Sequence, residues 1–348
     1  MKKYIVFLFT VVTLLLPQAV GAQSAATRYE AEIIELRPDK VAVQIMTGDQ
    51  KDKRYEVMLF DQKQVGSQRL QKGDRVLVSL LPARNGKQSV IIEDHVRTVP
   101  LAVLVGIFLL IVFVIGKWKG LLSTFAMVLS FFVIARFILP QILLGNDPLL
   151  ISLLGALFII PMTFYIAHGV RRQTTVAVIG TFLALIVTGA LSYFFVIYAK
   201  LTGFAAEEAT FIQTMVGTHI NMQSLLLAGI IIGAMGVLDD ITISQTTIVQ
   251  KLIKANPKYT FWKLYREAMD VGRDHIASLV NTLVLVYAGA ALPLFILFSS
   301  SQLGNFSQVV NMEIVSTEVV RTLVSSIGII TAVPITTFIA AKYLKKHA

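Results

Sequence analysis

Two hydrophobic patterns divide the chain. Between residues 27 and 98, apolar and polar positions alternate, as where Tyr29, Ala31 and Ile33 stand between charged neighbours. Alternation with a period of two is typical of half-buried strands, and turn residues separate several such short runs. We therefore predict a small β-barrel of OB-like type over 27–98.

From residue 99 onward, long continuous apolar runs replace the alternation. A run of about twenty apolar residues matches the roughly 30 Å hydrocarbon core of a bilayer. The predicted fold class is an all-α polytopic membrane bundle carrying the small N-terminal, extracytoplasmic β-barrel domain. We predict seven transmembrane helices, at 99–116, 120–139, 149–168, 175–198, 221–241, 275–298 and 322–341.

The N-terminus has the layout of a secretory signal peptide. Lys2 and Lys3 precede a short apolar segment, 5–16, and small residues lead to Ala22. This pattern predicts cleavage after Ala22, the alternative being an uncleaved anchor. The predicted domains are the signal peptide at 1–22, the β domain at 27–98 and the membrane domain at 99–348.

The charges predict the orientation of the helices. The net charge is +10, and the excess of Lys and Arg falls in short segments between spans, which is typical of cytoplasmic loops. We therefore expect an external N-terminal domain, a cytoplasmic C-terminus and no nucleic-acid partner. The basic positions are Lys117, Lys119, Arg171, Arg172, the segment 251–273, Lys342, Lys345 and Lys346. The chain has no cysteine, which excludes disulfides and thiolate metal sites.

A cytoplasmic segment at about 258–273 has apolar residues at helical spacing, with Trp262 and basic side chains among them. Such a helix is expected to lie along the membrane surface. The alternative is a soluble connecting helix.

Two adjacent carboxylates, Asp239 and Asp240, end an apolar run that begins at Leu225. A carboxylate near hydrocarbon depth is costly, so the pair is a candidate site for proton or ion coupling. Neighbouring helical side chains point about 100° apart, so one can face the bundle and the other the cytoplasmic interface. Asn281 and Thr282 of the next span are candidate hydrogen-bond partners. The alternative is a solvated pair that caps the following helical segment.

Two further groups of residues precede this pair. Gly229, Gly233 and Gly236 are spaced for close helix packing, the alternative being a hinge. Three more polar residues, Glu207, Glu208 and His219, form a predicted external polar cluster, which can equally be a solvated loop.

The segment GAMGVLDDITISQ at 233–245, with Glu207 and Glu208 before it and the amphipathic segment after it, resembles the YibE/F family of bacterial multi-spanning membrane proteins. A more distant resemblance joins Asp239, Asp240 and the polar span residues to the SecF subunit of the protein-export motor. SecF belongs with the resistance-nodulation-division transporters, whose central carboxylates couple transport to proton flow. This resemblance implies a bacterial cytoplasmic membrane protein with proton coupling.

The resulting functional hypothesis is a proton- or ion-coupled transporter or energy transducer. The alternative is a non-catalytic structural or accessory component for envelope assembly or export. We expect no catalytic residues, because no second span supplies a partner Asp and no histidine lies well inside a span. We also expect no cofactor and no metal. The expected partners are the lipid bilayer and either further copies of this chain or a homologous membrane subunit.

Overall fold

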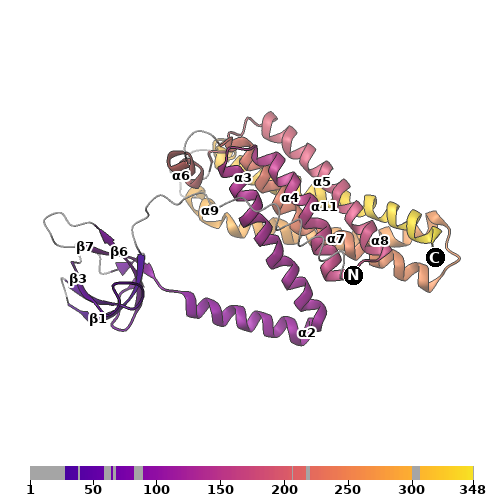
Figure 1. The fold of residues 1–348 in the computed structure, drawn as a ribbon. Helices are drawn as coiled ribbons and strands as arrows, with labels where there is room; N and C mark the ends of the chain where they lie inside the picture. The colour runs from indigo at the N-terminus through magenta and orange to yellow at the C-terminus, as the bar shows by residue number, and fades with distance from the viewer. Residues whose placement is uncertain are drawn as a thin grey trace. The chain divides into compact units, whose positions relative to one another are not determined.

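The structure is a computed structural model that describes residues 28–37, 40–58, 64–65, 68–81, 89–205, 207–216, 220–299 and 306–347 (Figure 1). These residues belong to two compact units, one ending at Lys117 and the other beginning at Trp118. The predicted signal peptide, 1–22, lies outside the described residues.

The first unit contains a curled antiparallel sheet with strand order β3-β2-β1-β6-β7. Alternate side chains of β1 and β2 are buried, which confirms the prediction from the alternating pattern. Two register shifts, between Ile33 and Glu35 and between Leu77 and Val78, act as bulges that bend the sheet around its core. The strands are β1 (Arg28–Leu36), β2 (Lys40–Ile45), β3 (Arg54–Met58), β6 (Arg75–Leu81) and β7 (Ser89–His95), with a separate ribbon of β4 (Gln64–Val65) and β5 (Gln68–Arg69).

Asp94, near the end of β7, is held by an arginine. Arg97 donates from Nη1 to Asp94 Oδ2 and from Nη2 to Asp94 Oδ1, both at 2.8 Å, and the backbone N–H of His95 donates to Oδ1 at 2.7 Å. The hydrogen bonds from Arg97, and then the one from His95, lower the pKa of Asp94 to about 2. Because the pKa is lower in the folded protein, the ionised carboxylate stabilises the folded state at pH values above about 3.9, which is the pKa in the unfolded chain. This contribution is lost as the pH falls towards 2.

We therefore expect acid to destabilise this sheet partly through Asp94. Between about pH 4 and about pH 2, the melting temperature of the β-sheet infrared band should fall more steeply in the parent protein than in the Asp94→Asn variant. Arg97→Gln is the matched variant and should flatten the pH dependence in the same way. The same steepness in all three proteins would contradict the prediction.

The remaining described residues are almost entirely helical. The first helix, α2, is interrupted at Lys117, where φ is 51° and ψ is −146°. The helices are α2 (Thr98–Val133), η1 (Ile134–Ile138, a π-helical turn), α3 (Leu139–Leu143), α4 (Pro148–His168), α5 (Arg172–Tyr198), α6 (Glu207–Val216), α7 (Met222–Ala255), α8 (Phe261–Ala290), α9 (Leu292–Ser299), α10 (Phe306–Val310) and α11 (Glu313–Lys346).

Five helical stretches in the described part of the chain are long and apolar enough to cross a membrane: Thr98–Leu143, Pro148–His168, Arg172–Tyr198, Met222–Ala255 and Glu313–Lys346. The predicted count of seven is not confirmed. The predicted spans 99–116 and 120–139 share the first stretch. The predicted span 275–298 divides between α8 and α9, and α8 ends at Ala290, too soon after the charged Arg273 and Asp274 to hold a full apolar span.

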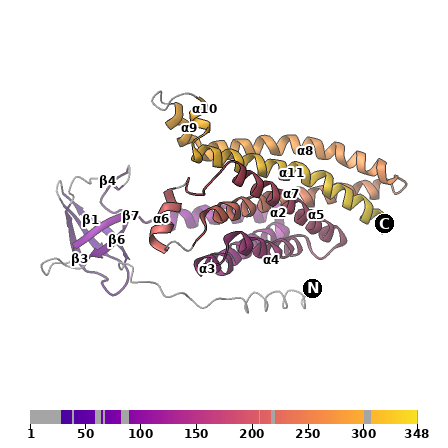
Figure 2. The same cartoon turned by 90° about the horizontal axis from the view of Figure 1, so that it is seen from above.

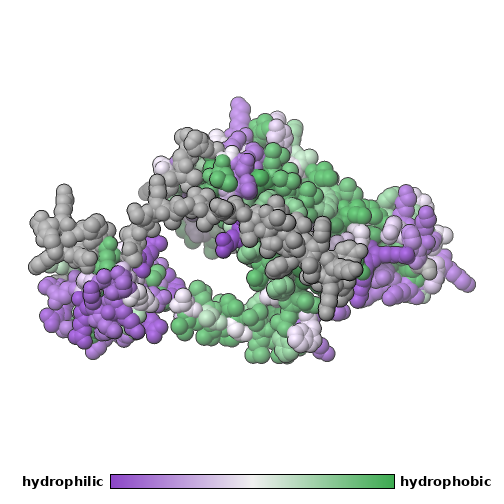
Figure 3. Space-filling view, viewed as in Figure 1, coloured by the Kyte–Doolittle hydropathy of each residue, from purple (hydrophilic) through white to green (hydrophobic). Residues whose placement is uncertain are grey.

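The core of the second unit is formed by α5, α7 and α11, which pack against one another. α4 covers one side of α7, and α8 lies along α11 (Figures 1 and 2). In the space-filling view, the surface over the middle of the helices is largely hydrophobic, whereas their end at the right of the picture is hydrophilic (Figure 3). Together with the apolar stretches, this surface identifies a multi-pass membrane protein.

Two glycines allow α5 and α11 to approach closely. A Cβ at Gly180 of α5 would collide with Thr336 of α11, and a Cβ at Gly328 of α11 would collide with Thr188 of α5. Each helix supplies one glycine and one threonine. The contact is antiparallel, because the glycine at the start of the pair on α5 meets the threonine at the end of the pair on α11, and the reverse holds for the other two residues. All four residues are buried.

The ends of α7, α8 and α11 extend past the predicted spans. α7 alone has 34 residues, which corresponds to about 51 Å at about 1.5 Å per residue. These ends pack on one another through a cluster that we call the end cluster. It comprises Val176, Val249, Ile253, Leu264, Ala268, Ala340, Ala341 and Leu344. The predicted amphipathic segment, 258–273, lies largely in the first half of α8 and buries Leu264 and Ala268 in this cluster.

Candidate functional site

The carboxylate of Asp239 lies between α7 and α4. Thr163 of α4 donates from Oγ1 to Asp239 Oδ2 at 3.3 Å, across 76 positions of sequence. The other carboxylate oxygen, Oδ1, is buried and has no hydrogen-bond partner among the described residues. An unpartnered buried oxygen on an ionisable group is costly, so it is unusual unless the group has a function.

Thr163 has more acceptors than its one hydroxyl proton can serve. Its Oγ1 lies 3.0 Å from the backbone oxygens of Ile159 and Ile160, as well as 3.3 Å from Asp239 Oδ2. A hydroxyl carries one donor and two acceptor lone pairs. Thr163 can therefore donate to an ionised Asp239, or donate to its own helix and accept a hydrogen bond from a protonated Asp239.

The neighbouring carboxylate, Asp240, is exposed. It lies within electrostatic range of His168, at the end of α4, which is also near the cationic side chains Lys119 and Arg171. The two carboxylates thus divide as their helical spacing predicts, with Asp239 towards the bundle and Asp240 away from it.

Asn281 and Thr282 lie on an exposed face of α8. Thr282 donates to the backbone oxygen of Ser278 at 2.9 Å. Within the described part of the chain, no hydrogen bond joins either residue to Asp239 or Asp240. The structure therefore does not bring these two predicted partners to the carboxylates.

The glycines of α7 face outward. Gly229, Gly233 and Gly236 are all exposed. A Cβ at Gly229 or Gly236 would meet nothing within 4 Å, and one at Gly233 would meet only Tyr287 Oη, at 3.9 Å, among the described atoms. No helix of the described chain packs closely on this stripe.

The predicted external cluster is described only in part. Glu208 is exposed at the start of α6, whereas His219 and the side chain of Glu207 lie outside the described residues.

A group of buried hydroxyls lies close to the Asp239 site and was not predicted. Thr181 of α5 and Thr242 of α7 share a hydrogen bond of 2.7 Å, and Thr242 Oγ1 also lies 3.3 Å from the backbone oxygen of Asp239. The hydroxyl of Thr336, against Gly180, is buried without a partner among the described residues. Threonine is common in membrane helices, so only the hydrogen bond across helices distinguishes Thr181 and Thr242.

Gln245 of α7 adds a polar link to α8. Its Nε2 donates to the backbone oxygen of Ala268 at 2.8 Å, and its side chain is buried. In the described ranges, no group of three or more His, Cys, Asp or Glu side chains is placed to hold a metal ion.

Comparison with known proteins gives one match. A family model described as YibE/F-like protein matches residues 104–346. No curated protein and no solved structure matches the chain. The family match covers most of the chain, including both carboxylates, Thr163 and the α5–α11 contact, so the chain belongs to the family of YibE/F-like proteins.

Proposed function

We propose that this protein is a proton- or ion-coupled membrane transporter or energy transducer, and that Asp239 is the group that takes up and releases the cation. The observation that carries this proposal is the Asp239 carboxylate, which contacts Thr163 with one oxygen and leaves the other buried and unpartnered among the described residues. Burial disfavours the charged form of a carboxyl group, so a cation at this site neutralises it.

Thr163 suits both states of such a group. In the ionised state, it donates its proton to Asp239 Oδ2. In the protonated state, the Asp239 hydroxyl donates to Thr163 Oγ1, and Thr163 donates to the backbone oxygen of Ile159 or Ile160. Proton uptake then needs only a hydroxyl rotation, with no change in heavy-atom positions.

The other predicted residues have secondary parts in the proposal. Asp240, exposed and within electrostatic range of His168, faces the water at that end of the helices. Asn281 and Thr282 reach the carboxylates only after α8 moves towards α7. The exposed stripe of Gly229, Gly233 and Gly236 supports a second copy or a homologous subunit as partner.

The proposed location is the bacterial cytoplasmic membrane, with the C-terminus inside and the β unit, after a signal peptide, outside. The hydrogen bond from Arg172 Nη1 to the backbone oxygen of His347 supports the orientation, because it puts the basic ends of α5 and α11 side by side. An OB-like barrel is supported by the strand order and by the approach of the edge strands β3 and β7.

The decisive experiment is infrared difference spectroscopy of the protein in lipid vesicles. We expect a band of a protonated carboxyl group that is lost when the pH is raised and that is absent from Asp239→Asn. Thr163→Val should keep the band but shift its frequency, because it removes the hydrogen bond. Where the band is present, proton flux across the vesicle membrane follows as the functional assay.

The control is Asp270→Asn, which removes an exposed carboxylate of α8 that pairs with Arg273 in its own helix. This variant should leave the band unchanged. If no carboxyl band disappears in Asp239→Asn, cation coupling at this site is rejected and a non-catalytic accessory role, with Asp239 only joining α7 to α4, takes its place.

A further inference from the structure

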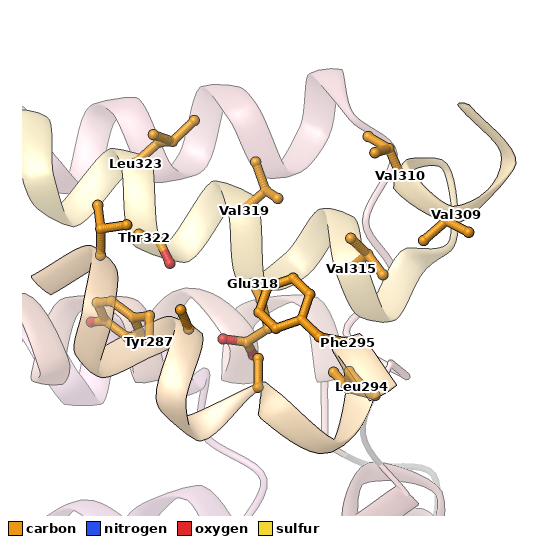
Figure 4. A pocket seen from close by; sticks show the side chains of 13 residues that line it. Tyr287, Leu294, Phe295, Val309, Val310, Val315, Glu318, Val319, Thr322 and Leu323 are labelled. Carbon is orange, nitrogen blue, oxygen red and sulfur yellow. The ribbon is translucent and has the colours of Figure 1, made fainter. Parts of the chain in front are cut away.

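A cavity of about 630 Å³ lies between the end of α8, the short helices α9 and α10, and the start of α11 (Figure 4). Its size is within the range of about 300 to 1,000 Å³ that small-molecule sites occupy. Its walls are almost entirely apolar, with Val284, Ala288 and Phe295 on one side and Val315 and Val319 on the other. None of the residues of the Asp239 site lines it.

One ionised side chain enters this apolar space. Figure 4 shows the carboxylate of Glu318 pointing from α11 towards Phe295 and the side where Tyr287 lies. Glu318 forms an ion pair with Arg321, with 2.9 Å between Arg321 Nη1 and Glu318 Oε1. In the described part of the chain, this is the only polar contact of the Glu318 carboxylate, and Arg321 Nε is buried without a hydrogen-bond partner. The wall of the cavity thus carries one acidic group, Glu318, and the cationic partner of this group, Arg321, lies one helical turn further along α11.

The depth of Glu318 matches the edge of a bilayer. Glu318 lies five residues, or about 7.5 Å, from Glu313, which begins α11 and accepts hydrogen bonds from the loop residue Thr202. The twenty residues that follow Arg321, up to Ala341, carry no charge. Around the cavity, Leu285 and Ile296 are 71% and 63% exposed, so it opens within a lipid-facing surface.

We propose that this cavity is a binding site for a membrane phospholipid with a primary amine, phosphatidylethanolamine. One acyl chain fills the apolar cavity, the ammonium group donates to the free oxygen of Glu318, and the phosphate accepts from Arg321. The presence of both charges favours this zwitterionic head over an anionic head without an amine, because such a head has no N–H for the second oxygen of Glu318 and brings a negative charge close to it. The proposal is independent of cation coupling at Asp239.

The test is a native mass spectrometry titration of the purified full chain with dioleoylphosphatidylethanolamine and, separately, dioleoylphosphatidylcholine. The two lipids have the same tails, but the choline head has no N–H to donate. We expect the ethanolamine lipid to bind at least about ten-fold more tightly, and Glu318→Gln to remove most of this preference.

Cavity filling provides a second, structure-based control. Ala288→Trp fills the cavity and should abolish the bound lipid, whereas Leu285→Trp, one turn away and directed outward, should retain it. Equal binding of the two lipids to the parent protein, or lipid retention in Ala288→Trp equal to that in Leu285→Trp, would overturn the proposal.

Discussion

A Gly203→Ala substitution is expected to lower the free energy of unfolding by about 3 kcal/mol, as the sum of backbone strain and overpacking. Gly203, in the loop after α5, has φ +86°, which an alanine adopts with strain. A Cβ at this position would also collide with the backbone carbonyl of Met222 and lie 2.9 Å from the nitrogen of Gln223. Backbone atoms cannot rotate away as a side chain can.

The surrounding contacts prevent the loop from moving aside. Glu313 accepts hydrogen bonds from the backbone nitrogens of Thr202 and Gly203 at 2.6 and 3.0 Å, and Gln223 donates to the oxygen of Leu201 at 2.7 Å. The collision must therefore be relieved by shifting the start of α7.

Thermal and denaturant unfolding in detergent measure this effect. Gly145→Ala is the matched control, because Gly145 has φ +88° but nothing within 4 Å of its Cβ position. It should cost only the strain, about 1 kcal/mol. Equal losses in the two variants would show that the loop can accommodate the extra methyl group.

A Gly328→Ala substitution is expected to cost about 2 kcal/mol through overpacking of the α5–α11 contact. The added methyl group would collide with the hydroxyl of Thr188. Thr188 is stiff because it is β-branched, and its hydroxyl donates to the backbone oxygen of Ala184 at 2.9 Å. The helices must separate to accept the change.

A double-mutant cycle tests this explanation. Thr188→Ala removes the colliding oxygen, so the double variant should recover most of the stability lost in Gly328→Ala, with a coupling energy of about 1 kcal/mol or more. Gly229→Ala, on the exposed face of α7, should stay within about 0.5 kcal/mol of the parent. Additive losses in the cycle would rule out the proposed contact.

Local patterns were sufficient to predict the strands and to single out the carboxylate pair as a candidate site. Within each strand of the sheet, apolar residues alternate with polar ones and mark the buried face. Ala31 and Val43 could therefore be identified as core positions without knowing which strands pair with theirs. The pair Asp239 and Asp240 was equally visible, because two charges at the end of an apolar run need no further context.

Contacts between distant helices could not be predicted in the same way. Neighbouring side chains on a helix point about 100° apart, so Asp239 and Asp240 must face different surroundings. Only the position of α4 decides which of the two is enclosed. Its residue Thr163 is 76 positions away from Asp239 in the sequence. The sequence shows Thr163 as a polar residue in an apolar run, which marks it as a candidate without naming its partner.

The glycines illustrate the same limit. Gly229 and Gly233 have the spacing of a packing motif, yet they face outward. The close approach instead uses Gly180 and Gly328, one on each of two helices, and neither has a second glycine at packing distance. A contact that pairs glycine with threonine across helices leaves no periodic signal in either one.

The end cluster implies that this molecule has two cores in two different solvents. Lipid tails are as apolar as leucine, so the helices within the bilayer are held by close packing and hydrogen bonds, with little help from the hydrophobic effect. Five of the eight residues of this cluster, among them Val249 and Leu264, lie past the predicted spans, where burial from water stabilises them. Urea, which weakens that effect, should therefore separate the protruding ends of α7, α8 and α11 before it disturbs α5 and α11 at Gly328. The protruding end is thus stabilised by burial of apolar side chains from water, whereas the core within the bilayer is stabilised by close packing of its helices.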